Sequence, residues 1–296
     1  MREVKQRRTA LKRALSGKSI VVAPGVFDGV SARIADRMGF AALYMTGYGA
    51  VASSLGLPDA GIATFTEMAG RARMIAGITS TPLIADADTG YGGLLNVRHT
   101  VRGYEAAGVC AIQIEDQEFP KKCGHMLGRR VVAVDDMVAK IRVACDSRDD
   151  PDFLIIARTD ARTTHGLDEA LRRGEAYARA GADLLFIESP ESVEEMERIG
   201  RAFDRPLVAN MVEGGRTPVL PAAELERIGY RLAIFPALGF LAATAAMEKA
   251  FTSLMDKRSS LDPGVPLYEF QAMSRLMGFD EVTAFDRKYR DAAPGA

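Results

Sequence analysis

Residues 121–125 read Lys-Lys-Cys-Gly-His and place a thiol among cationic or protonatable neighbours. Positive charge beside a cysteine favours the thiolate and lowers the thiol pKa toward neutral pH. Such a thiol can act as a nucleophile or as a general acid. We interpret Cys123 as a candidate catalytic residue whose pKa is tuned by Lys121 and His125. The alternative is an unreactive cysteine in a loop of solvated lysines.

Three carboxylates stand at the ends of apolar runs and offer the oxygen ligands that hard cations prefer. They are Asp86, Asp88 and Glu115. We expect a bound Mg²⁺ at this point, with Mn²⁺ as the alternative. Such a cation suits a 2-hydroxy or 2-oxo acid, because it neutralises adjacent carboxylate and hydroxyl or keto oxygens.

Other polar residues could bind the rest of that acid. Arg158 can hold a carboxylate in a bidentate fork, and Asn210 can donate to its far end. Residues 46–49 read Thr-Gly-Tyr-Gly, which we interpret as a turn with backbone N–H groups near the same site. The two glycines are equally consistent with a turn requirement alone. With Glu188 holding the network together, this set fits cleavage of a carbon–carbon bond.

Composition restricts the class of protein. The chain has 296 residues, 48% of them hydrophobic, and its formal net charge of -1 offers no basic surplus for nucleic acid. Three cysteines are too few for a disulfide framework and indicate a reducing, cytoplasmic compartment. No apolar run reaches the roughly 20 residues that span a bilayer, so we expect no membrane partner. The basic segment 1–16 is interpreted as a surface helix with Leu11 and Leu15 as its apolar stripe.

Eight short apolar runs alternate with amphipathic stretches such as 168–180 and 192–203. The runs cover residues 20–23, 42–45, 82–85, 111–114, 153–157, 184–187, 206–209 and 232–235. Alternation of strand and helix predicts parallel strands covered by helices, and continuous apolar runs predict strands buried on both faces. The number of units, and the lack of a Gly-rich fingerprint after the first run, favour a closed (β/α)₈ barrel over an open sheet.

Polar residues follow six of these runs, and a barrel would gather them at the carboxyl ends of its strands, where active sites lie. They are Thr46, Asp86 with Asp88, Glu115, Arg158 with Asp160, Glu188 and Asn210. No linker interrupts the alternation, so we predict a single domain over residues 1–296. A long helical stretch, 241–257, and a further helical tail exceed what a closed barrel needs.

Five motifs resemble the isocitrate lyase/phosphoenolpyruvate mutase superfamily. They are DADTGYG at 86–92, IEDQ at 114–117, KKCGH at 121–125, ARTDA at 157–161 and NMVEGG at 210–215. The resemblance runs from about residue 22 to residue 240 and is strongest to the 2-methylisocitrate lyase, 2,3-dimethylmalate lyase and carboxyphosphonoenolpyruvate mutase group. It implies a (β/α)₈ barrel with a C-terminal helix exchanged between subunits, a homotetramer and Mg²⁺.

The resemblance also implies roles for individual residues. Cys123 would protonate the carbanion left after retro-aldol cleavage, and Tyr44 would deprotonate the substrate hydroxyl, although a core tyrosine is an equal alternative. Asp86 and Asp88 would bind the metal, and Glu115 would bind metal-bound water. The full expected set is catalytic Cys123, Lys121, His125, Glu188 and Tyr44, substrate-binding Thr46, Gly47, Tyr48, Gly124, Arg158 and Asn210, and metal-binding Asp86, Asp88 and Glu115.

We therefore expect a Mg²⁺-dependent lyase that splits a substituted malate or methylisocitrate into a 2-oxo acid and a second carboxylate. Leu241 stands where the resemblance leads us to expect an Arg that binds a third carboxylate. We therefore expect the site to suit a tricarboxylate less well than a dicarboxylate. A phosphonomutase and an oxaloacetate hydrolase or decarboxylase are the alternative enzymes. Residues 236–239 lack the hydroxyl residue expected of the hydrolase. A barrel that binds a 2-oxo acid without turnover is the alternative outside enzymes.

Overall fold

The computed structural model describes residues 2–124, 126 and 128–290. Contacts divide the chain into two compact units, Met1–Phe240 and Leu241–Ala296. The first contains all the strands, and the second contains helices. The single domain over residues 1–296 stays a prediction, because each unit is described by itself.

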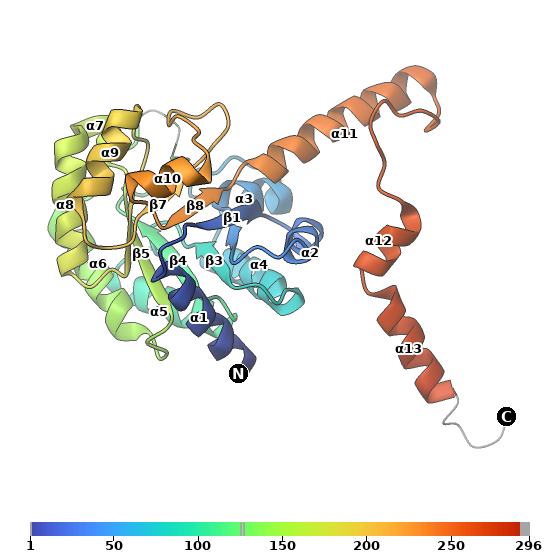
Figure 1. The fold of residues 1–296 in the computed structure, drawn as a ribbon, viewed down its shortest axis with the longest axis horizontal. Coiled ribbons are helices and arrows are strands. Elements are labelled where there is room, and N and C mark those ends of the chain that lie inside the picture. The colour runs from blue at the N-terminus through green and yellow to red at the C-terminus, as the bar shows by residue number, and fades with distance from the viewer. Residues whose placement is uncertain (1, 125, 127, 291–296) are drawn as a thin grey trace. The chain divides into compact units, whose positions relative to one another are not determined.

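The first unit is built around eight strands that pair in parallel in the order β6-β5-β4-β3-β2-β1-β8-β7. A parallel bridge between Leu185 and Leu207 joins the two ends of this order. The strands are β1 (Val21–Val26), β2 (Leu43–Met45), β3 (Leu83–Asp86), β4 (Ala111–Glu115), β5 (Leu154–Thr159), β6 (Leu184–Ile187), β7 (Val208–Asn210) and β8 (Leu232–Phe235). The predicted (β/α)₈ barrel is confirmed (Figure 1).

One helix, α1 (Arg2–Leu15), precedes the first strand, and the others follow strands in the chain and surround the barrel (Figure 1). These others are α2 (Gly29–Asp36), α3 (Gly47–Leu55), α4 (Phe65–Ile78), α5 (Leu94–Ala106), α6 (Val134–Ser147), α7 (Arg162–His165), α8 (Leu167–Arg179), α9 (Val193–Ala202) and α10 (Ala222–Ile228). Side chains cap several of them, as Thr64 and Glu67 do in the capping box of α4. The two predicted amphipathic stretches correspond to α8 and α9.

Apolar side chains form two cores. Strand residues that face the barrel interior pack with Leu11 and Leu15 of α1, both of them buried as the helical stripe predicted. Strand residues that face outward pack with the surrounding helices. Because each strand is covered on both sides, its sequence is apolar without alternation. Within the strands, polar residues therefore lie mainly at the carboxyl ends, and Gln113, inside β4, is an exception.

The segment 46–49 begins a helix, and the prediction of a simple turn is wrong. Thr46 is the N-cap of α3, and its hydroxyl accepts a hydrogen bond from the Gly49 N–H at 3.4 Å. A Ser or Thr N-cap satisfies one of the N–H groups that have no partner within the helix. The first turn of α3 thus faces the carboxyl end of the barrel.

The second unit contains most of α11 (Leu238–Lys257), which begins in the first unit, and then α12 (Phe270–Leu276) and α13 (Phe279–Arg290). The predicted helical stretch 241–257 lies within α11. Neither α11 nor α13 buries a residue. Within the described residues, no helix is long and apolar enough to cross a membrane.

Candidate active site

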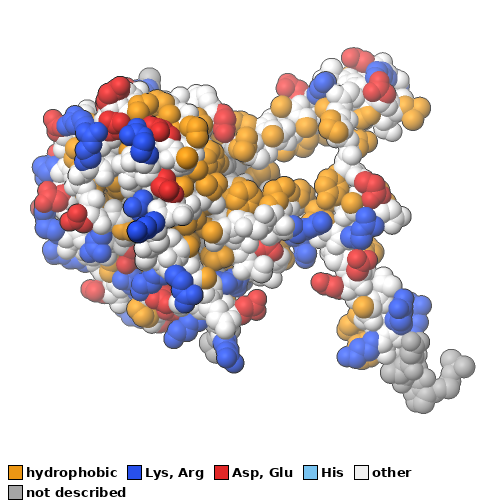
Figure 2. All heavy atoms as spheres, viewed as in Figure 1, with side chains coloured by type: hydrophobic (Ala, Val, Ile, Leu, Met, Phe, Trp, Pro, Cys, Tyr) orange, Lys and Arg blue, Asp and Glu red, His pale blue; other side chains and the backbone are white. Residues whose placement is uncertain are grey.

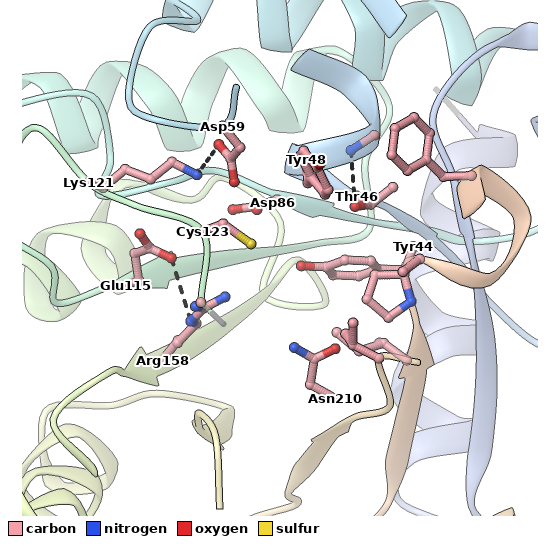
Figure 3. Close-up of a pocket in the computed structure, with 18 of the residues that line it drawn as sticks. Tyr44, Thr46, Tyr48, Asp59, Asp86, Glu115, Lys121, Cys123, Arg158 and Asn210 are labelled. Atoms are coloured by element: carbon pink, nitrogen blue, oxygen red, sulfur yellow. Dashed lines mark hydrogen bonds and ion pairs between the residues drawn. The ribbon is translucent and has the colours of Figure 1, made fainter. Parts of the chain in front are cut away.

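A pocket opens at the carboxyl ends of the strands, where the sequence placed the site (Figure 3). Its lining includes polar residues from five strand ends and from the segment that carries the cysteine. The lining residues are Tyr44, Thr46, Gly47, Tyr48, Gly49, Asp59, Asp86, Glu115, Lys121, Lys122, Cys123, Gly124, Arg158, Asn210, Val212, Ile234, Pro236, Ala237 and Phe240. Asp88 and Glu188 contact this set through Lys121 and Arg158.

Asp86 ends β3 at the floor of the pocket. One of its oxygens, Oδ1, accepts hydrogen bonds from the Asp88 N–H at 2.9 Å and from Nε2 of Gln113 at 3.4 Å. The backbone of Gly47 approaches so closely that a Cβ there would collide with the other oxygen, Oδ2. Glycine at position 47 is therefore required by the carboxylate beneath it.

Lys121 is 3% exposed, and its ammonium forms an ion pair with Asp59 (Figure 3). It forms a second ion pair with Asp88. Burial alone would lower the pKa of Lys121, but Asp88, Glu115 and other carboxylates raise it well above its usual range. The ammonium is thus a fixed positive charge among the carboxylates that the sequence predicts to bind metal. Its role in tuning Cys123 stays a prediction.

The three predicted metal-binding carboxylates are buried, and burial raises the pKa of each. That of Asp88 rises to about 7, with Lys121 opposing the shift. Those of Asp86 and Glu115 are also raised, that of Glu115 well above its usual range. Glu115 in addition has a buried oxygen, Oε1, with no hydrogen-bond partner among the described residues. A bound cation would stabilise the ionised carboxylates and would give the Glu115 oxygen a partner.

Buried carboxylates outnumber buried cations in this network. The carboxylates are Asp59, Asp86, Asp88, Glu115, Asp160 and Glu188, and the cations are Lys121, Arg129 and Arg158. The raised pKa values of Asp88 and Glu115 show that protons neutralise part of this excess in the absence of a ligand. A divalent cation would displace those protons and compensate the ionised carboxylates. Within the described parts of the chain, no three His, Cys, Asp or Glu side chains already form a metal-holding group. Mg²⁺ needs few direct protein ligands, because it usually keeps several waters.

Arg158 lies at the centre of a second group of charges. It donates from Nε and Nη2 to the two oxygens of Asp160, each at 2.9 Å. Its remaining ion pairs join Glu115 at 3.5 Å and Glu188 at 3.4 Å. Asn210 donates from Nδ2 to Oε2 of Glu188 at 3.1 Å. The predicted carboxylate-binding residues are thus adjacent, and Glu188 joins them.

Tyr44 stands beneath both groups. Its hydroxyl donates a hydrogen bond to Oε1 of Gln113 at 2.9 Å. Burial raises the pKa of Tyr44 well above its usual value, and nearby Arg158 opposes that shift. The side chain is therefore a neutral phenol in this arrangement.

Cys123 is half-buried and free of a disulfide. Its thiol points into the space that Asp86, Tyr44 and Arg158 surround (Figure 3). The Lys122 ammonium donates a hydrogen bond to the Gly128 carbonyl at 3.2 Å. His125 lies outside the described residues.

Sequence reasoning missed two residues of this site. Asp59, in the loop between α3 and α4, pairs with Lys121, and nothing in its local sequence indicates a buried carboxylate. Gln113 bridges Tyr44 and Asp86. An amide inside the apolar run 111–114 was a usable signal, because buried polar groups need partners.

Fold and site together define an α/β barrel enzyme architecture with a carboxylate-rich pocket for a divalent cation and a small acid. Residues 11–255 match the phosphoenolpyruvate phosphomutase family, and the chain belongs to it. It is 50% identical to a 2,3-dimethylmalate lyase of Eubacterium barkeri over 94% of this chain and 96% of that protein. It is 42% identical to a 2-methylisocitrate lyase of Aeropyrum pernix over 95% of this chain and 89% of that protein.

Solved structures agree with this assignment. An oxaloacetate acetylhydrolase with 3,3-difluorooxalacetate has a TM-score of 0.90 and 36% identity, over 97% of both chains. A 2,3-dimethylmalate lyase of the PEP mutase/isocitrate lyase superfamily has a TM-score of 0.88 and 42% identity, over 97% of this chain and 95% of that chain. A phosphonopyruvate hydrolase with oxalate and Mg²⁺ has a TM-score of 0.85 and 30% identity, over 96% of this chain and 99% of that chain. The resemblance drawn from the five motifs is confirmed.

Proposed function

We propose that this enzyme is a Mg²⁺-dependent carbon–carbon lyase. It splits an alkyl-substituted malate into a 2-oxo acid and a second carboxylate. The observation that carries the proposal is the single pocket in which the Cys123 thiol, the Arg158 guanidinium and an excess of buried carboxylates meet. The relatives named as lyases, at 50% and 42% identity, support the same class of reaction.

The metal would be held by Asp86, Asp88 and Glu115, with Asp59 and Lys121 adjusting the charge around it. The Glu115 oxygen that has no hydrogen-bond partner among the described residues supports this assignment. When bound, a divalent cation would neutralise the carboxylate and 2-oxygen of the acid and favour the 2-oxo product. Mg²⁺ is preferred to Mn²⁺ because a related hydrolase has been solved with oxalate and Mg²⁺.

The cleavage requires one proton to leave oxygen and one to reach carbon. The substrate hydroxyl gives up its proton, the bond between carbons 2 and 3 breaks, and its electron pair stays on carbon 3. Cys123 then delivers its thiol proton to carbon 3 as a general acid. Tyr44 is the assigned base. Burial and the nearby carboxylates raise its pKa well above the usual value and Arg158 opposes that shift, so the phenol would have to lose its proton when a divalent cation adds positive charge to the pocket. Arg158 and Asn210 bind the substrate carboxylates.

The wall of the pocket nearest β7 and β8 is apolar, which favours an alkyl substituent over a third carboxylate. It consists of Val212, Ile234, Pro236, Ala237 and Phe240. The Phe240 ring packs edge-to-face on Phe27 and Tyr48, with centroid distances of 5.6 and 5.3 Å. Cations among the described lining residues are limited to Lys121, Lys122 and Arg158. A methylisocitrate would place its third carboxylate against this apolar wall.

Oxaloacetate cleavage is the second candidate, favoured by the TM-score of 0.90 to an oxaloacetate acetylhydrolase. Hydrolysis of oxaloacetate needs a water as nucleophile and gives oxalate and acetate rather than an alkyl-substituted acid. The two candidates are therefore separated by their products.

A coupled assay for 2-oxo acid release tests the proposal. The panel contains 2,3-dimethylmalate, methylisocitrate, isocitrate and oxaloacetate, each with Mg²⁺ and with EDTA. We expect 2,3-dimethylmalate to release a 2-oxo acid in the presence of Mg²⁺, and we expect EDTA to abolish this release. Oxalate from oxaloacetate would establish the second candidate. If no acid in the panel is cleaved and phosphorus NMR shows phosphonate formation, the protein is a mutase. If oxalate binds and no turnover is found, the protein is a sensor.

We also propose that the protein is a cytoplasmic homotetramer whose subunits exchange the C-terminal helix. Large apolar side chains are exposed along α11, α12 and α13, as the orange spheres show (Figure 2). They include Phe251, Met255, Phe270, Phe279 and Phe285. Exposed apolar area of this extent is typical of an interface. Light scattering on the purified chain tests the assembly, and a monomer would contradict it.

A further inference from the structure

The backbone before Cys123 is held by one side chain. Gln117, which follows β4 and is 2% exposed, donates from Nε2 to the Lys122 carbonyl at 2.8 Å. Its Oε1 accepts a hydrogen bond from the Lys122 N–H at 2.9 Å. Both backbone groups of Lys122 are therefore bonded to the same buried amide. An amide can do this because it carries a donor and an acceptor side by side.

The backbone after Cys123 is held by another side chain. Ser189, which follows β6 and is fully buried, places its hydroxyl 3.0 Å from the Gly124 carbonyl and 3.0 Å from Oε1 of Glu188. The hydroxyl proton is shared between these two acceptors. Ser189 has a φ of 58°, a left-handed conformation that is costly for a residue with a side chain. The surrounding structure thus keeps this serine in a strained position.

Gly124 lies directly against the carboxylate-binding group. A Cβ at this position would collide with Nη2 of Arg158 and would lie 3.1 Å from the carboxyl carbon of Glu188. The hydrogen bond from Ser189 therefore sets the distance between the Cys123 segment and Arg158. A shift of that segment would move the thiol relative to the substrate carboxylate.

We propose that Gln117 and Ser189 are positioning residues that fix the backbone on either side of Cys123. The inference rests on the proposed role of Cys123 as the acid. A proton donor is effective only when its atom is held near the carbon that receives the proton, and a small displacement costs rate. Gln117 fixes the backbone position of residue 122, and Ser189 fixes that of residue 124. The thiol of Cys123 between them therefore has a defined direction.

The test uses Ser189→Ala, Ser189→Gly and Gln117→Glu, with Ser192→Ala as the matched control. Ser192 is three residues further on, and its hydroxyl caps α9 without contacting residues 122–124. Hydrogen–deuterium exchange is measured on peptides that cover residues 121–126. We expect exchange about five- to tenfold faster in the three variants, because local opening becomes easier when an anchoring hydrogen bond is lost. The control should exchange at the wild-type rate.

Ser189→Gly separates the hydroxyl from the backbone strain, because glycine adopts the left-handed conformation freely. Fast exchange in both Ser189 variants supports the hydroxyl as the anchor. Fast exchange in Ser189→Ala alone would assign the effect to backbone fit and overturn the proposal. Wild-type exchange in Gln117→Glu or in both Ser189 variants would also overturn it.

Kinetics then connects the anchors with the acid. We expect kcat to fall about tenfold in each variant and KM and oxalate affinity with Mg²⁺ to change less, because the Arg158 and Asn210 side chains are kept while the donor is displaced. Fast exchange with unchanged kcat would overturn the positioning role. If the wild-type chain cleaves none of the acids, the proposed function fails, whereas the exchange data still report on the anchors.

Discussion

The two ends of the barrel bury charge in opposite ways. At the amino end, Arg8 of α1 is 6% exposed and is matched by Glu105 at 3.3 Å, Asp150 at 3.2 Å and the Val109 carbonyl at 3.1 Å. At the carboxyl end, carboxylates exceed cations, and Glu115 keeps an oxygen without a hydrogen-bond partner among the described residues. The first arrangement is complete without a ligand, and the second is not.

Backbone strain also differs between the amino and carboxyl ends of the barrel. Asp88 and Ser189, both at the carboxyl end, have φ values of 48° and 58° although neither is glycine. At the amino end, Leu11 of the helix α1 fills the barrel interior and is fully buried. Strain and unmatched charge persist only where the rest of the fold is stable enough to hold them. The comparison therefore separates residues that stabilise the fold from residues that serve the reaction.

The largest effect is expected at Arg158. Replacing it by Leu removes the cation that pairs with Glu188 and leaves Asp160 with Arg129 as its cation. This loss should lower the free energy of unfolding by about 3–5 kcal/mol and abolish 2-oxo acid release. Urea unfolding and the coupled assay measure the two losses. Arg158→Lys is the control, because it restores a charge without the bidentate fork. Unfolding of Arg158→Leu at the wild-type urea concentration would contradict this account of the carboxyl end.

The next effect is expected at the amino end. Leu11→Ala should lower the free energy of unfolding by about 2–5 kcal/mol, because a fully buried leucine is replaced by a cavity. Its kcat at 25 °C should stay within about twofold of the wild-type value, because position 11 lies at the far end of the strands. A large loss of kcat in the folded variant would show that the two ends are not separable.

The smallest effect concerns the other cysteines. Burial raises the pKa of Cys145, on α6, to about 11 and also raises that of Cys110, which precedes β4. Thiols react as thiolates, so a raised pKa suppresses alkylation at all lower pH values. We expect iodoacetamide at pH 7.5 to modify Cys123 alone, and the Cys145 rate to rise about tenfold per pH unit above it. Peptide mass spectrometry checks this, and faster labelling of Cys145 than of Cys123 would contradict it.

The sequence allowed much of this architecture to be predicted, because strands covered on both faces must be apolar throughout. β6 and β8 have the same bounds as their predicted runs, and the polar strand ends meet in one pocket as expected. The partners of Lys121 could not be predicted. Asp59 lies far from it in the chain, and only the fold brings the two side chains together.

The geometry of the hydrogen bonds could not be predicted from the sequence either. The Thr46 cap of α3 depends on the direction in which the chain leaves β2. The residue types alone predict a turn at this segment and do not indicate the start of a helix. The anchors of Cys123 come from Gln117 and Ser189, on two different strand ends. Residue type alone does not predict which buried polar groups form hydrogen bonds with one another.

The measurement that tests the central claim most directly is a comparison of Cys123→Ser with the wild-type enzyme. The variant keeps the residues that we propose to bind metal and carboxylate, so oxalate should bind with the same affinity in the presence of Mg²⁺ by calorimetry. Turnover of the substrate found in the panel should fall by about 10²–10⁴-fold, the usual contribution of a general acid. Near-wild-type release of the 2-oxo acid by Cys123→Ser would contradict the assignment of the thiol as the proton donor.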